Sequence, residues 1–121
     1  MTAVLDAGAL IALERHDPRM LTLLATRPAG EDIVVPAGVL AQVWRGGPQA
    51  VLSRFLNTGV VVEPLDAHTA RAVGLLLGLT GTRDVVDAHV VWAARKHKAV
   101  IVTSDPEDMR RLDPGAALHV V

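Results

Sequence analysis

The stretch AVIVTSDPEDMRRL, residues 99–112, contains the repeating unit of the fold. Its first four residues are apolar and three of them are β-branched, which predicts a strand that is buried on both faces. Asp105-Pro106 then supplies a helix N-cap followed by proline in the first turn, so we expect a helix to 112. A buried strand followed at once by a helix is typical of parallel α/β domains.

The same alternation of short apolar runs and helices extends over the rest of the chain. Strands are expected at 3–5, 33–35, 60–62, 99–102 and 118–121. Helices are expected at 8–15, after 17–18, at 39–44, at 50–56, from 66 to about 81, from 82 or 83 to about 98, and at 107–112. Five strands and about seven helices predict a three-layer α/β/α domain with a mostly parallel sheet, and 121 residues suit one such domain, 1–121.

Composition narrows the class of protein. Twelve Lys and Arg residues against 13 Asp and Glu residues give a formal net charge of −1, so any nucleic-acid role must come from a local site. A hydrophobic content of 50% excludes disorder, and an aromatic content of 2% argues against a base-stacking surface. The chain has no cysteine, no visible signal peptide and no apolar run long enough for a membrane span, so we expect a cytoplasmic protein.

Four aspartates fall where an open parallel sheet binds its ligands, outside the carboxyl ends of the strands. Asp6 ends the first strand, and Asp105 follows the fourth. Asp84 and Asp87 begin the helix that precedes the fourth strand, and their i, i+3 spacing puts them on one helix face. Converging carboxylates repel one another unless a cation lies between them, so the pattern predicts Mg²⁺ bound by oxygen ligands. A metal held in this way serves phosphoryl chemistry.

Each of these acids also has a structural interpretation. Asp105 precedes a proline and would be a good N-cap, while Asp84 would complement a helix dipole. Asp6 and Asp87 stand among apolar residues, where an unpaired acid is costly, so for them the functional interpretation is favoured. Asp108 could join the rim of the site, but a solvated helix face is favoured for it.

Four motifs resemble, in order and at compatible spacing, those of PIN-domain ribonucleases. They are VLDAGAL at 4–10, VPAGVLAQVWRG at 35–46, DVVDAHVV at 84–91 and VTSDPED at 102–108. The compact chain looks most like the VapC-type toxins of type II toxin–antitoxin systems. The resemblance implies a Mg²⁺- or Mn²⁺-dependent endoribonuclease that acts on RNA, is held inactive by a cognate antitoxin and tends to form a homodimer. It also implies a sheet in the order 3-2-1-4-5.

The resemblance further assigns roles to single residues. It implies that Asp6 and Asp87 are the principal metal ligands and that Asp105 completes the acidic site, directly or through water. It also implies that Thr103 and Ser104 hold a phosphate or a water on the metal.

The second motif departs from the family pattern at Gln42, where a glutamate is usual. An amide oxygen can still bind a metal or a water, but it brings no charge. Asp84 is an acid near the site that would restore this charge; alternatively, the site is weakened and the protein mainly binds RNA. Candidates for the RNA backbone, each of which is otherwise a solvated side chain, are Arg45, Arg83 and Lys96.

Taken together, these features predict a metal-dependent endoribonuclease with a toxin role, in which an activated water attacks an RNA phosphodiester. One alternative is a receiver-like regulatory domain, whose aspartate cluster also binds Mg²⁺. Helix pairs interrupt the regular alternation, and no lysine follows a late strand at the site edge, so the sequence disfavours it. The other alternative is a non-catalytic PIN module that binds RNA or a partner protein, and Gln42 favours it.

Overall fold

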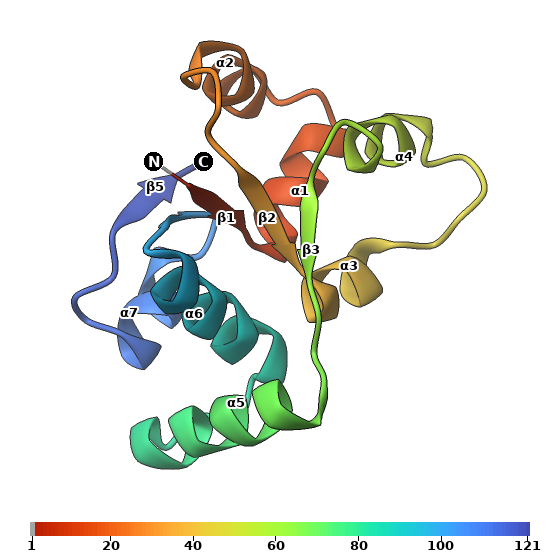
Figure 1. Ribbon diagram of the computed structural model, residues 1–121. Coiled ribbons are helices and arrows are strands. Elements are labelled where there is room, and N and C mark those ends of the chain that lie inside the picture. Colours follow the sequence, from red (N-terminus) through yellow and green to blue (C-terminus); the bar gives the residue numbers. More distant parts are fainter. Residues whose placement is uncertain (1) are drawn as a thin grey trace.

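The computed structural model describes residues 2–121, and a five-stranded parallel sheet forms their centre (Figure 1). The strands are β1 (Ala3–Leu5), β2 (Ile33–Pro36), β3 (Val61–Glu63), β4 (Val100–Thr103) and β5 (Leu118–Val120). Their order is β3-β2-β1-β4-β5, and every neighbouring pair is parallel. The predicted strand order is confirmed, and the sheet is wholly rather than mostly parallel.

Seven helices within the described residues flank this sheet. They are α1 (Ala7–Glu14), α2 (Pro18–Thr26), α3 (Ala37–Val43), α4 (Ala50–Leu56), α5 (Ala67–Thr80), α6 (Val85–His97) and α7 (Pro106–Leu112). Helix α6 packs on β1, β2 and β4, and it also contacts α5 and α7. Helix α1 covers the other face of the sheet, with α2 and α4 beside it (Figure 1). This arrangement is the predicted three-layer α/β/α domain. Among residues 2–121, no helix has both the length and the apolar character needed to cross a membrane.

The core is aliphatic and is densest around the three central strands. Val4, Leu5, Val34 and Val35 are fully buried, and so is Ile101. The two edge strands are less buried, because Val61 and Val62 of β3 and Val120 of β5 are exposed. Burial on both faces therefore depends on a strand's place in the sheet, which its apolar composition does not reveal.

Two helix boundaries determine the acidic edge of the sheet. Helix α5 ends at Gly81, whose left-handed φ of 67° suits glycine, and α6 begins at Val85 rather than at the predicted 82 or 83. The reason is Asp84, which is the N-cap of α6 and accepts a hydrogen bond from the backbone N–H of Asp87 at 2.9 Å. The four residues 81–84 thus form a short link beside the carboxyl ends of the strands.

Candidate functional site

The adjacent ends of β1 and β4 place Asp6 beside Thr103. Leu5 and Val102 are register partners, and the backbone N–H of Asp6 donates to the carbonyl of Val102 at 3.1 Å. The Thr103 hydroxyl accepts a hydrogen bond from the backbone N–H of Asp105 at 2.8 Å and also bonds the Asp6 carboxylate. Thr103, which is fully buried, therefore links two of the predicted site acids.

Asp6 is both a buried acid and a helix cap. Its side chain is 4% exposed and accepts a hydrogen bond from the backbone N–H of Ala9 at 2.8 Å, at the start of α1. Burial raises the pKa of Asp6, and the hydrogen bonds from Thr103 and from nearby backbone N–H groups only partly oppose this shift. The carboxylate is therefore held in place while its charge is incompletely compensated.

Ser104 lies against the start of α1 at Gly8. A Cβ atom on Gly8 would stand 1.8 Å from the Ser104 Oγ, so only glycine fits at this position. The contact holds the loop after β4 against Asp6, and Ser104 remains exposed at its surface. The hydroxyl is thus next to the acids, as the resemblance implied for this residue.

Asp87, in the first turn of α6, is the electrostatic centre of the site. Burial raises its pKa to about 7, and the charges of Asp84, Asp108, Asp6 and Asp105 add to the shift in that order. The four predicted acids therefore form one interacting group, and a fifth aspartate joins them.

That fifth acid, Asp108, lies at the rim of the site, which was the alternative, so the favoured placement on a solvated helix face is wrong. Its hydrogen bond with Asp105 is the largest cause of the raised pKa of Asp105, ahead of burial and of charge repulsion. Asp105 stands at the N-cap position of α7 but makes no capping hydrogen bond, so its structural interpretation is also wrong. The available signal was the i, i+3 spacing of the two residues, which repeats that of Asp84 and Asp87.

Gln42 stands where the second motif usually has a glutamate, and Asp84 was expected to restore the missing charge. The structure places these two residues differently. Asp84 is exposed and caps α6, and its charge raises the pKa of Asp87. It therefore caps a helix and also lies close to the site acids. Gln42 lies on α3 with an exposed side chain that makes no hydrogen bond within residues 2–121.

Only one of the three candidate RNA-binding cations lies beside the acids. Arg83 lines the same cavity as Asp84 and Asp87. The Arg45 guanidinium instead donates to backbone carbonyls at the end of α3, one of them at 2.7 Å. Lys96 pairs with Glu63 at 2.8 Å, and it is about 13 Å further along α6 than Asp87. The structure gives Lys96 no place at the acidic edge.

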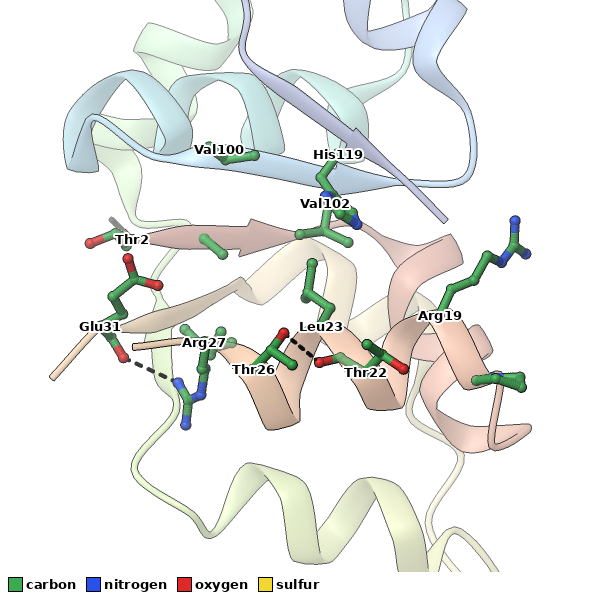
Figure 2. A pocket seen from close by; sticks show the side chains of 13 residues that line it. Thr2, Arg19, Thr22, Leu23, Thr26, Arg27, Glu31, Val100, Val102 and His119 are labelled. Carbon is green, nitrogen blue, oxygen red and sulfur yellow. Dashed lines mark hydrogen bonds between the residues drawn. The ribbon is translucent and has the colours of Figure 1, made fainter. Parts of the chain in front are cut away.

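Three of the five acids, Asp84, Asp87 and Asp108, line a polar cavity of about 540 Å³. It is lined by Thr80, Gly81, Thr82, Arg83, Asp84, Asp87, Asp108, Arg111 and Leu112. A larger cavity of about 610 Å³ lies elsewhere, between α2 and the strands (Figure 2). Leu23 of α2 and Val100 and Val102 of β4 face it, with Arg19 and Arg27 towards its two ends. Its single carboxylate, Glu31, cannot provide the chemistry of the acidic cluster.

The donor set of the acidic site consists of carboxylate and hydroxyl oxygens, which suit Mg²⁺ and Mn²⁺. Within residues 2–121, no three His, Asp or Glu side chains close into a ready cage for one ion. Mg²⁺ usually binds one or two carboxylates and keeps several waters, so the residues fit a hydrated cation better than an enclosed one.

Three solved structures share this fold at low sequence identity. VapBC2 from Rickettsia felis, bound to a DNA fragment from their promoter, is 16% identical with a TM-score of 0.73, and the match covers 100% of this chain and 99% of that one. FitAcB from Neisseria gonorrhoeae is 17% identical with a TM-score of 0.66, over 96% and 95% of the two chains. VapC20 from Mycobacterium tuberculosis, a sarcin-ricin loop cleaving toxin, is 23% identical with a TM-score of 0.67, over 82% and 86%.

No curated protein sequence matches the chain significantly. The protein-family model described as PIN domain matches residues 3–114 of this chain. These residues contain strands β1 to β4, all seven helices and every acid of the site. The protein therefore belongs to the PIN domain family.

Proposed function

We propose that this protein is a metal-dependent endoribonuclease and the toxin of a toxin–antitoxin pair. The observation that carries the proposal is the convergence of five aspartates on the carboxyl edge of the sheet, where burial and then the neighbouring carboxylate charges raise the pKa of Asp87 to about 7. A fold has little reason to concentrate repelling charges unless a cation or a substrate uses them. Membership of the PIN domain family and a fold shared with an RNA-cleaving toxin support the same conclusion.

In this proposal each acid has a definite task. Asp6 and Asp87 hold the cation, Asp105 and Asp108 complete the acidic site around it, and Asp84 supplies the charge that Gln42 does not. When bound, Mg²⁺ or Mn²⁺ supplies charge neutralisation at the scissile phosphate and activation of the attacking water. Thr103 keeps the Asp6 carboxylate oriented through its hydroxyl.

The protein side of the site also positions the RNA. The Ser104 hydroxyl lies exposed beside Asp6, where it can donate a hydrogen bond to a phosphate oxygen. Arg83 lies beside Asp84 at the cavity wall and has no ion-pair partner among residues 2–121, so its guanidinium is available to the RNA backbone. The N-termini of α1, α6 and α7 meet at this edge, and their positive dipole ends favour a phosphate there.

We further propose a cognate antitoxin, a homodimer and a cytoplasmic location. VapBC2, which has the same fold, was solved bound to DNA from their promoter, so a partner that links the toxin to promoter DNA is the expected regulator. A second candidate function, RNA binding without cleavage, is favoured by Gln42, which supplies no charge and makes no hydrogen bond in the described chain.

RNA cleavage by purified variants separates the two functions. We expect cleavage by the unchanged protein, its loss in EDTA, its return with Mg²⁺ or Mn²⁺, and its loss in Asp6→Asn and Asp87→Asn. Asp66→Asn is the matched control, because Asp66 also caps a helix by accepting from the i+3 backbone N–H at 2.8 Å, at α5 rather than at the site. Cleavage that persists in EDTA or in Asp87→Asn would refute the metal-dependent function.

A further inference from the structure

Arg111 of α7 lies in the same cavity as the site acids and was not singled out from the sequence. Its guanidinium pairs with Asp108 at 3.3 Å, while the Arg111 side chain remains 72% exposed. A guanidinium carries five N–H donors, so this one contact leaves most of them free to bind another group. Asp108 lines the same cavity as Asp87, so its pairing with Arg111 ties this arginine to the acidic site.

The cavity walls carry both signs of charge. Asp84, Asp87 and Asp108 provide the negative part, and Arg83 and Arg111 provide the positive part. An RNA strand presents a phosphate at every nucleotide, so when one phosphate lies at the acids, the next must lie close by. The carboxylates would repel that second phosphate unless a fixed cation faced it.

We propose that Arg111 binds the RNA phosphate next to the one that is cleaved, and that Asp108 orients its guanidinium. The identity of the ligand as RNA rests on the proposed function. A guanidinium suits this role because its planar fork of donors matches two phosphate oxygens at once, and Asp108 restricts its orientation before the RNA arrives.

The neighbouring residue Arg110 provides a matched control. It is also an exposed arginine of α7, and it also pairs with an acid at i−3, Glu107, at 2.7 Å. Arg110 does not line the cavity, and Arg111 does. If Arg111 merely stabilises its helix through a surface ion pair, replacing either arginine by alanine should have the same effect on RNA binding.

The test measures RNA binding in an Asp87→Asn background, which prevents cleavage during the measurement. Two short, fluorescent, single-stranded RNAs of unrelated sequence are titrated by anisotropy at several salt concentrations. We expect Arg111→Ala to weaken binding by about tenfold for both sequences alike, because a phosphate contact carries no sequence information. The slope of log affinity against log salt should become shallower by about 0.7, the value for one phosphate contact on a single strand.

Two further variants sharpen the result. Arg110→Ala should leave the affinity and the salt slope unchanged. Arg111→Lys should restore the salt slope but only part of the affinity, because it keeps the charge and loses the fork of donors. Melting temperatures of all variants verify that each is folded, which the exposure of both arginines leads us to expect.

The outcomes distinguish this inference from the proposed function. Equal effects of Arg110→Ala and Arg111→Ala, or an unchanged salt slope for Arg111→Ala, would overturn the role of Arg111 while leaving metal-dependent cleavage intact. Arg111-dependent RNA binding by a protein that cleaves nothing would support the inference and refute the nuclease. Failure of the Asp87→Asn parent to bind either RNA would overturn the inference itself.

Discussion

The two cavities of this protein differ in how they arise. The larger one, about 610 Å³, lies where α2 stands off the sheet, and its walls are mainly the aliphatic and methyl groups of ordinary strand and helix residues. The smaller one, about 540 Å³, lies where the end of α5, the start of α6 and α7 pack together. This helix packing brings three aspartates to the wall of the second cavity, whereas Glu31 is the only carboxylate that lines the first. Converging charge therefore marks the candidate site better than cavity size does.

The largest expected effect comes from neutralising the centre of the acidic cavity. Asp87→Asn should lower RNA cleavage by at least about a hundredfold, because it removes a metal-binding carboxylate. Val102→Ala, which changes the wall of the apolar cavity, should leave the cleavage rate per folded molecule unchanged. Cleavage rates measured on both variants check this, and an equal loss in the two would contradict the separation of roles.

The apolar cavity should instead affect stability. Val102 is 1% exposed, so Val102→Ala removes buried methyl groups worth about 1.6 kcal/mol of unfolding free energy. Urea unfolding with and without Mg²⁺ measures this loss of unfolding free energy. The stabilisation by Mg²⁺ should be the same in the wild type and in the variant. A smaller response to Mg²⁺ in Val102→Ala would show that the two cavities are coupled.

A smaller effect is expected at Asp84, within the acidic cavity. Asparagine caps a helix about as well as aspartate, so Asp84→Asn tests the charge while keeping the cap of α6. Mg²⁺ affinity, measured by calorimetry, should fall by about tenfold. If Asp84 compensates for Gln42, Gln42→Glu should rescue much of that loss, and the double-mutant cycle should be non-additive. Strict additivity would leave Asp84 as a cap near the site.

The smallest effect is a pH dependence of stability in the metal-free protein. The folded pKa of Asp87, about 7, lies above its ordinary value, so the stability linked to this group is present at acidic pH and is lost as pH rises through about 7. The raised pKa values of Asp6 and Asp105 act in the same direction. The melting temperature should therefore fall between about pH 4 and pH 7, and Asp87→Asn should raise it by a few degrees above that range.

Asp66 supplies the control for this pH series. Its pKa is lowered by the hydrogen bonds from Thr69, so ionised Asp66 stabilises the fold and Asp66→Asn should bring no gain at high pH. A melting temperature for Asp87→Asn below that of the wild type at every pH would show instead that the carboxylate supports α6.

The parallel sheet and most of the acidic site could be predicted from the sequence, because both follow from local patterns. Asp6 stands directly after an apolar run, Asp105 stands three residues after one, and Asp87 stands among apolar residues, so their positions at strand and helix ends can be inferred without coordinates. The strand order came from the resemblance to a family and not from the runs themselves, since any of several orders would bury them.

Other features depend on tertiary contacts that no local pattern encodes. Asp108 has the sequence surroundings of a solvated helix residue, and only the packing of α7 against α6 brings its charge close to Asp87. Lys96 looks like a free cation in the sequence, but the end of β3 brings Glu63 to it. Such pairings join residues that are distant in the chain, and for that reason they were missed.

The pairing of β1 with β4 has a consequence for how the protein is made. Asp6 is translated well before Asp105, and most of the elements of the fold lie between them in the sequence. Until β4 has been synthesised, the edge of β1 that faces away from β2 has no strand beside it. A nascent chain therefore carries an open strand edge and an incomplete set of acids until β4 and α7 have been translated. The acidic site is complete only once β4 lies beside β1.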